Sequence, residues 1–205
     1  MNYATHMSIG IIGAGRIGSA LARAIHRAGL RASICNSRDP STLAHLEQAL
    51  GPSVRPATRN DVALSDIVFV AVPWSKVGAA LDGLGPWHGQ VVVDCNNPLE
   101  APHFKRIPLE GRRSSEIVAS HVPGARVVKA FNHLPPDLLE STSISSPEKR
   151  VAFVSGDDPE ANRLVGSLSR RLGFFPIDLG SLSGGGSLLE FPGGPLPGLN
   201  LVRMQ

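Results

Sequence analysis

The sequence predicts an α/β protein: a doubly wound parallel sheet with helices on both faces, forming three αβα layers in a single domain with a short C-terminal tail. Short, apolar, β-branched runs alternate with stretches of helical periodicity along most of the 205 residues. Such alternation is typical of strand–helix–strand units, whose crossovers place the strands parallel. Hydrophobic residues make up 42% of the chain and charged residues 18%, so we expect a packed core rather than disorder.

The first strand and helix have the clearest pattern. Ser8–Gly13 ("SIGIIG") is a continuous β-branched run, as a strand buried on both faces requires. Arg16–Ala28 follows as a helix, because its apolar residues fall on one stripe at helical spacing. Gly29 stands where a helix usually ends, and Arg31–Asn36 is expected as the second strand.

The middle of the chain continues this alternation with shorter elements. Pro40–Leu50 is expected as a helix that stops at Gly51 and Pro52. Pro98–Arg113, which is rich in proline and charge, is expected as a loop. The other expected elements are strands near Val54–Arg55 and over Ser65–Pro73, Gln90–Asn96 and Ala125–Phe131, and helices over Lys76–Leu84 and Ser114–Val122, the last with a serine cap.

The last part of the chain carries one more strand–helix–strand unit, at Arg150–Gly156, Pro159–Leu172 and Phe174–Gly180. Its helix has a typical start, because Asp158 can cap it and proline stands at the first position. The pair Asp157–Asp158 is therefore interpreted as capping rather than as a metal site. The tail is dense in glycine and proline, and only Ser187–Phe191 is expected as a short helix.

A glycine-rich motif lies between the first strand and the first helix. "GAGRIG" places Gly13, Gly15 and Gly18 in the G-x-G-x-x-G arrangement. Gly13 permits the tight turn, Gly15 lets a pyrophosphate approach the backbone, and Gly18 lets the helix pack closely on the strand. Free N–H groups at the helix start can hold phosphates. We therefore expect a Rossmann-type dinucleotide site, the alternative being a plain strand–turn–helix without a ligand.

The end of the second strand reads Asn36-Ser37-Arg38, where a dinucleotide fold usually carries an acidic residue beside the adenosine ribose. An arginine forms bidentate, charge-assisted hydrogen bonds with a 2′-phosphate, and a serine hydroxyl donates another. Because Arg38 falls 20 residues after Gly18, the sequence favours NADP(H) over NAD. Two alternatives remain open: Arg38 lies in solvent beside a turn, or Asp39 serves as the acidic group.

Composition argues against several other function classes. The net charge is +3 and no run of lysines alternates with aromatics, so we expect no nucleic-acid partner. No apolar run approaches the ~20 residues that cross a bilayer, and the N-terminus lacks the pattern of a signal peptide, so we expect a cytoplasmic protein without a membrane partner. Cys35 and Cys95 are expected as small apolar residues on two buried strands, with a redox pair as the alternative. No metal-ligand spacing is present.

Seven stretches of the sequence together resemble a known family. "IGIIGAGRIGSALA", "NSRDP", "VAVPW", "VVVDCNNPL", "VVKAFNHLP", "VSGDDPEA" and "LGFFPIDLG" resemble the NADPH-dependent reductases of the 5-deazaflavin coenzyme (factor 420). They are more distantly similar to the cytosolic domain of the six-transmembrane metalloreductases and to the cofactor domain of pyrroline-5-carboxylate reductases. Residues 1–7 precede the first strand and are expected as a disordered extension, followed by an NADP-binding Rossmann domain at 8–180 and a tail at 181–205 packed on the pocket or on a partner subunit.

The glycine motif and the resemblance together give the expected cofactor site. Val72, Pro73 and Asn97 follow carboxyl ends of strands, where ligands bind in open α/β sheets. Trp74 is either a lid on the nicotinamide edge or a core aromatic. The expected NADP-binding residues are Gly13, Ala14, Gly15, Arg16, Ile17, Gly18, Asn36, Ser37, Arg38, Val72, Pro73, Trp74, Val77, Asn97, Ala130 and Asn132.

Reduction of a carbonyl or an imine usually needs a proton donor, whereas hydride transfer to a flavin or deazaflavin needs little from the protein beyond position. His133, directly after "AFN", is the best-placed catalytic candidate, and a structural histidine is the alternative. His121 is a second candidate. Asp94 is expected to orient a loop, and Lys129 to reach solvent at a sheet edge.

The sequence therefore predicts an NADP(H)-dependent oxidoreductase that transfers hydride between NADPH and a deazaflavin, a flavin or another small acceptor. The alternative is a non-catalytic NADPH-binding module that senses the redox state. The tail segment "PGGPLPGLNL" is apolar, which favours a buried tail or the contact of a homodimer.

Overall fold

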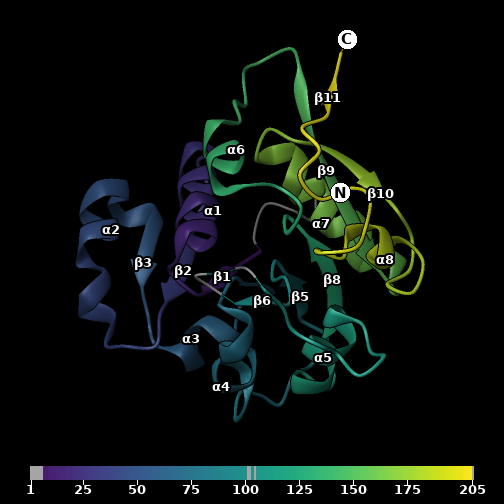
Figure 1. Cartoon of the computed structure of the whole chain (residues 1–205). Helices are drawn as coiled ribbons and strands as arrows, with labels where there is room; N and C mark the ends of the chain where they lie inside the picture. Colours follow the sequence, from purple (N-terminus) through teal and green to yellow (C-terminus); the bar gives the residue numbers. More distant parts are fainter. Residues whose placement is uncertain (1–6, 101–102, 104, 205) are drawn as a thin grey trace.

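The computed structural model describes residues 7–100, 103 and 105–204, so the extension expected at residues 1–7 lies outside it except for Met7. The predicted alternation of strands and helices is confirmed along most of the chain (Figure 1). The strands are β1 (Ile9–Ile12), β2 (Ala32–Cys35), β3 (Val54–Pro56), β4 (Ile67–Val70), β5 (Val91–Asp94), β6 (Leu99–Glu100), β7 (Lys105–Arg106), β8 (Arg126–Ala130), β9 (Lys149–Gly156), β10 (Phe175–Asp178) and β11 (Val202–Arg203).

The helices are short, except for the first one and the one that follows β9, which have 12 and 13 residues. The α-helices are α1 (Arg16–Arg27), α2 (Ala44–Leu50), α3 (Arg59–Ala63), α4 (Val77–Leu81), α5 (Ser114–His121), α6 (Pro136–Ser141), α7 (Pro159–Arg171) and α8 (Gly185–Leu189). Three 3₁₀ turns precede or follow them, at η2 (Pro40–Leu43), η3 (Gly51–Ser53) and η4 (Trp74–Lys76). Among the described residues, no helix is long and apolar enough to cross a membrane.

Six strands form the parallel half of the sheet in the order β3-β2-β1-β4-β5-β8. Numbered among themselves along the chain, these strands have the order 3-2-1-4-5-6 of a doubly wound dinucleotide fold. The predicted doubly wound parallel sheet is therefore confirmed up to β8, and the sheet departs from it only where β9 joins β8 antiparallel and β10 then joins β9 parallel. The connection after β8 carries only α6, which packs against α1 and provides no crossover that would return β9 in the parallel direction.

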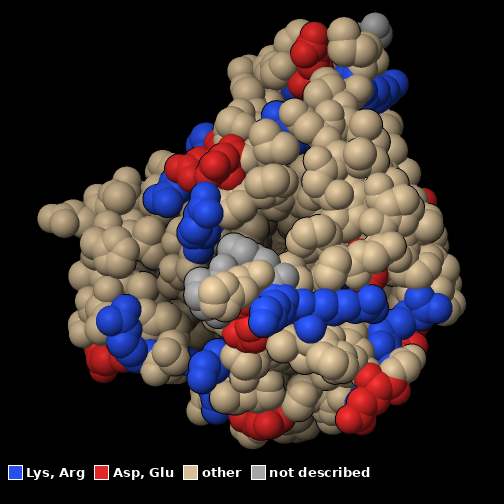
Figure 2. All heavy atoms as spheres, in the orientation of Figure 1, with Lys and Arg blue, Asp and Glu red and all other residues tan. Residues whose placement is uncertain are grey.

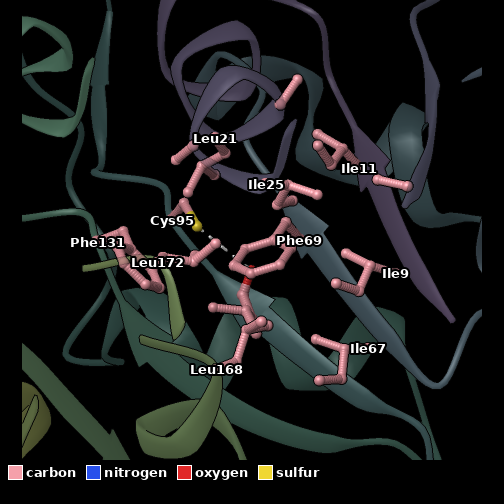
Figure 3. Packing of buried hydrophobic residues seen from close by; sticks show 14 of the residues in the cluster. Ile9, Ile11, Leu21, Ile25, Ile67, Phe69, Cys95, Phe131, Leu168 and Leu172 are labelled. Carbon is pink, nitrogen blue, oxygen red and sulfur yellow. Dashed lines mark hydrogen bonds between the residues drawn. The ribbon is translucent and has the colours of Figure 1, made fainter. Parts of the chain in front are cut away.

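Helices cover both faces of this sheet, which confirms the three αβα layers. Along β4, Ile67 and Phe69 belong to the apolar cluster under α1, α2, α6 and α7, whereas Val68 and Val70 belong to the cluster under α3, α4 and α5. Figure 3 shows side chains from several of these elements gathered around Phe69. A strand that packs on both faces needs apolar residues at every position, which explains the continuous runs in the sequence.

Some local expectations differ from the structure. Helix α3 was not expected from the sequence, and it packs closely over β1 at Gly10. A Cβ at this position would lie 2.5 Å from the Val62 carbonyl oxygen, so the close approach requires glycine. The N-cap of α5 is Arg113, not a serine, and its backbone N–H donates to the Glu116 carboxylate at 2.9 Å. At α7 the predicted cap is confirmed, since the Asp158 carboxylate accepts from the backbone N–H of Ala161 at 2.7 Å.

Candidate cofactor site

The glycine loop between β1 and α1 has the geometry that each of its glycines was expected to provide. Gly13 has φ +108°, and a Cβ on it would lie 2.2 Å from the Ala71 carbonyl oxygen. A Cβ on Gly18 would lie 1.8 Å from the Gly13 carbonyl oxygen, so α1 packs on the loop only with glycine at this position. Gly15 is exposed and has nothing within 4 Å of a Cβ position, which leaves room for a pyrophosphate against the backbone.

The amino end of α1 is also free to bind an anion. Gly15 is its N-cap, no side chain caps the helix, and its first turn holds no acidic residue. The first N–H groups of a helix lack intrahelical partners and lie at the positive end of its dipole. Arg16 forms an exposed ion pair with Asp137 of α6 at 3.1 Å, and Ile17 packs against the core.

Arg38 extends into solvent at the end of β2 without a partner. Its backbone N–H donates to the Asn36 side chain at 2.8 Å, while its guanidinium has no hydrogen bond or ion pair among the described residues. Asp39 is engaged, because its carboxylate accepts from the Ser41 backbone N–H at 2.9 Å and so caps η2. The hydrogen bonds from the Ser41 side chain and backbone lower the pKa of Asp39. The cation is therefore available to a ligand, and the carboxylate beside it is in use.

The loop after β4 is tied to the end of β5. The backbone N–H of Val72 donates to the Asn96 side chain at 2.9 Å. Pro73 follows, exposed, and Trp74 is half-buried against the cluster that also contains Val77. Val77 is only 2% exposed, so it contributes to the apolar cluster on which this loop packs.

Asn97 and Asn132 join the carboxyl ends of β5 and β8. The Asn97 amide donates to the Asn132 carbonyl oxygen at 2.8 Å, and the Asn132 amide donates to Asn97 Oδ1 at 2.9 Å. The Asn132 amide also donates to the Leu189 carbonyl oxygen at 2.7 Å, which brings the tail to the same place. Asn132 Oδ1 is buried and has no hydrogen-bond partner. Between Asn132 and the buried Ala130, Phe131 has φ +62°, a strained backbone conformation for a residue of this size.

A buried ionic network stands beside this pair. Lys129 was expected to reach solvent, which is wrong: its side chain is 1% exposed, and its ammonium lies 3.1 Å from the Asp94 carboxylate. The ammonium also donates to Ser114 Oγ at 2.9 Å and to the Asn96 carbonyl oxygen at 3.2 Å. A buried charge is stable only with such compensation. In the sequence, the indication of this network is one lysine and one aspartate in two otherwise apolar strands. The fold places the two residues opposite each other in neighbouring strands.

Asp94 is the acceptor at the centre of this network. Its Oδ1 accepts from the Asn96 backbone and side chain at 3.0 and 2.9 Å, and its Oδ2 accepts from Ser115 at 2.7 Å. Asp94 therefore orients the loop after β5, as expected. Ser114 in turn donates to the Glu190 carboxylate at 3.1 Å, which links the network to the tail.

The two histidine candidates lie in different surroundings. His133 is buried, its ring centroid lies 5.1 Å from that of Phe153, and its Nε2 lies 3.5 Å from the Phe153 backbone nitrogen. Burial lowers the pKa of His133 to about 4, so this geometry supports the structural role. His121 Nδ1 lies 2.7 Å from the Asp82 carboxylate in a partly exposed pair between α5 and the end of α4.

The two cysteines are free and buried, as expected of small apolar residues. Burial raises the pKa of Cys35 to about 11, against smaller opposing contributions from the Gly13 backbone and Arg59. Burial also raises the pKa of Cys95. Thiols held in the protonated form are poor nucleophiles, so neither cysteine contributes a reactive group here.

Known proteins resemble this chain in sequence and in structure. Residues 8–98 match the family model described as "NADP oxidoreductase coenzyme F420-dependent". The structure of a hypothetical protein, SMa0349 of Sinorhizobium meliloti, is 42% identical and superimposes with a TM-score of 0.91 over 97% of both chains. That of a protein described as an F420-dependent NADP-reductase, from Arthrobacter sp. FB24, is 27% identical with a TM-score of 0.67, over 87% of this chain and 86% of that one.

Among curated proteins, the rat (Rattus norvegicus) metalloreductase STEAP3 is 32% identical over 181 residues, which is 85% of this chain and 34% of STEAP3. The chain thus spans about a third of the length of this relative. The match over residues 8–98 includes the glycine loop and the Ser37-Arg38 pair. Over residues 8–98 the chain is thus similar to this family of NADP-dependent oxidoreductases.

Proposed function

We propose that the chain binds NADPH across the carboxyl edge of its sheet and transfers hydride from it to a flavin or a deazaflavin. The observation that carries this proposal is the pairing of an open anion site at Gly15 with an unpartnered guanidinium at Arg38. The pyrophosphate would lie on the amino end of α1, and the 2′-phosphate would lie against Arg38 and Ser37. The engagement of Asp39 as a cap favours this arrangement over one in which a carboxylate binds the ribose.

The nicotinamide end would lie at the loops that follow β4, β5 and β8. Asn132 Oδ1 is a buried acceptor without a donor, and a buried orphan acceptor costs about 1–3 kcal/mol. The carboxamide of a nicotinamide is a donor that could satisfy it. Leu189 and Glu190 contact Asn132 and Ser114, so we assign residues 8–180 to NADP binding and residues 181–205 to a tail that closes this pocket.

The acid–base groups at this edge favour a flavin-type acceptor. NADPH supplies the hydride when it is bound, and the protein holds the two rings at the right distance. His133 is buried with a lowered pKa, and Lys129 and Asp94 are occupied by each other and by their neighbours. An imine or a carbonyl would need one of them as a proton donor, whereas a flavin or deazaflavin ring can take its proton from water. The relative described as F420-dependent favours the deazaflavin.

Stopped-flow oxidation of NADPH against flavins and deazaflavins tests the reaction. We expect turnover with at least one of them. Tight binding of NADPH without oxidation by any acceptor would instead support the redox-sensing module.

The preference for NADPH can be tested apart from turnover. Arg38→Ala should weaken NADPH binding by about 2 kcal/mol, through loss of a charge-assisted contact, and should leave NADH binding unchanged. Asp39→Ala is the matched control, since it removes the cap of η2 and should keep the preference for NADPH. Equal losses of both nucleotides in Arg38→Ala would contradict the assignment, and calorimetry measures both.

A further inference from the structure

A surface cavity lies at the end of α1 that is far from the glycine loop. It has a volume of about 470 Å³, which is within the range of small-molecule pockets. The carboxyl ends of α1 and α2, the loop that leads into β2 and the turn η3 form its wall. Since α1 has 12 residues, its two ends are about 18 Å apart. The cavity is therefore separate from the cofactor site at the amino end of this helix.

The base of the cavity is apolar. Leu50 belongs to the core cluster around Phe69, and Leu30 packs against that cluster. Gly29 and Gly51 also line the cavity, and a Cβ at either position would have nothing within 4 Å. Both glycines thus border open space, and a hydrocarbon group that enters the cavity would remove apolar surface from water.

Three polar side chains line the cavity, each from a different segment: His26 of α1, Arg31 of the loop and Ser53 of η3. Ser53 Oγ donates its only proton to the Leu50 carbonyl oxygen at 2.8 Å. In the hydrogen bond of 2.7 Å between Ser53 and His26 Nδ1, the histidine is therefore the donor. His26 Nε2 is left without a partner among the described residues, and in the neutral ring this nitrogen is an acceptor.

Arg31 is the cation of this cavity. It is exposed, and its guanidinium has no hydrogen bond or ion pair within the described part of the chain. None of the described residues that line the cavity is acidic. An arginine in such a place can bind a carboxylate through two parallel hydrogen bonds.

The arginines of α1 itself are not available in this way. Figure 2 shows acidic and basic side chains next to each other where α6 packs on α1. Each arginine of α1 has a partner on α6: Arg16 pairs with Asp137, Arg23 with Glu140, and Arg27 donates to the Leu139 carbonyl oxygen. Arg31 comes after the end of α1, so α6 does not neutralise it.

We propose that this cavity binds a small carboxylic acid with an apolar side chain and a donor group, an amine or a hydroxyl, on the carbon next to its carboxylate. The carboxylate would bind Arg31, the donor would bind His26 Nε2, and the side chain would cover Leu30 and Leu50. The carboxyl ends of α1 and α2 add partial negative charge that favours the donor. Aliphatic amino acids and the corresponding 2-hydroxy acids share this chemistry. The site depends on neither NADPH nor hydride transfer.

The probe is leucine, compared with molecules that each differ in one group. 2-Hydroxy-4-methylpentanoate replaces the amine by a hydroxyl, 4-methylpentanoate lacks the donor, 3-methylbutylamine lacks the carboxylate, and glycine lacks the side chain. NMR titration of ¹⁵N-labelled protein gives each Kd, with the amides of Gly29 and Gly51 as reporters. We expect leucine or the hydroxy acid to bind about tenfold more tightly, or better, than the last three. The tighter of the two identifies the donor, and equal binding assigns the site to either donor.

Two variants test the residues that carry the proposal. Arg31→Gln should weaken leucine binding about tenfold, because a charge-assisted contact is lost, and should leave the Kd of NADPH unchanged. Ala49→Phe should abolish leucine binding, since Ala49 is an exposed residue of α2 that lines the cavity. Both positions are exposed, so thermal unfolding should stay the same. Arg163→Gln on α7 is the matched control, because Arg163 is exposed and has no side-chain partner in the described residues; it should change neither ligand.

Four results would overturn the site. The first is that neither leucine nor the hydroxy acid causes saturable shifts at Gly29 and Gly51. The second is equal binding of leucine and glycine, and the third is unchanged leucine binding in Arg31→Gln. The last is displacement of leucine by NADPH, which would place the amino acid at the cofactor site.

Discussion

The buried pair of Lys129 and Asp94 can be tested by removing the charges singly and together. Lys129→Met removes an ammonium that has three partners, at 2.9, 3.1 and 3.2 Å, and keeps most of the volume of the side chain. Both members of the pair are at most 1% exposed. Asp94 would then be a buried carboxylate without a counter-charge, next to neutral donors only.

The structure sets the expected magnitude. Breaking a buried pair by removing one partner costs about 3–5 kcal/mol, because the other charge stays buried. For a chain of this length, that corresponds to a fall in Tm of roughly 6–20 °C. Adding Asp94→Asn removes the stranded charge while its side-chain oxygen can still accept from Asn96, so the double variant should recover about half of the loss or more.

Equilibrium unfolding of the two single variants and the double variant gives the coupling energy directly. We expect about 2 kcal/mol or more of favourable coupling. Asp137→Asn, which removes a partner from the exposed pair with Arg16, is the surface control and should leave the midpoint unchanged. A loss below about 1 kcal/mol in Lys129→Met, or losses that simply add in the double variant, would refute the account of this network.

Other predictions concern the glycine loop and the buried histidine. Gly18→Ala should lower the unfolding free energy by about 2 kcal/mol or more, because its Cβ would meet the Gly13 carbonyl oxygen at 1.8 Å. Gly15→Ala has open space around it and should keep the fold while NADPH binds at least tenfold more weakly, as calorimetry would show. His133 has a folded pKa of about 4, below the ordinary 6.5, so protons bind the unfolded chain more tightly and stability falls as the pH drops from about 6.5 to about 4. Unfolding curves should show this fall to be about 3 kcal/mol larger than in His133→Gln, and equal slopes would contradict the assignment.

Much of the fold could be predicted because its strongest elements have local causes. The run at β1, the stripe on α1 and the Asp158 cap of α7 each depend on neighbouring residues. Helices α3 and α6, of five and six residues, were missed, since segments this short give only a weak helical period. The direction of β9 depends on where α6 packs, which is a tertiary fact that no local pattern encodes.

The same distinction between local patterns and tertiary contacts applies to the candidate site. The glycine loop could be predicted because its tight turn and the close packing of α1 require glycine at those positions, and the role of Arg38 in binding a nucleotide stays a prediction. The Lys129 network could not, since an isolated lysine in an apolar strand is compatible with an edge position until the register places it opposite Asp94. Likewise, the contact of Leu189 with Asn132 joins residues 57 apart, in a tail whose composition predicts little order.

Several unfavourable features of the fold lie where the ligands are expected. Phe131 keeps a strained backbone at φ +62°, which costs about 1–3 kcal/mol, and its neighbour Asn132 keeps an orphan buried acceptor. Arg38 stands without a counter-charge among the described residues. A fold selected for stability alone would remove such features, as it has satisfied Ser155 and Ser169 by backbone carbonyls. The orphan acceptor and the unpaired guanidinium become favourable only when a donor group or an anion arrives, so these two groups weaken the free protein and preorganise it for a phosphorylated nucleotide.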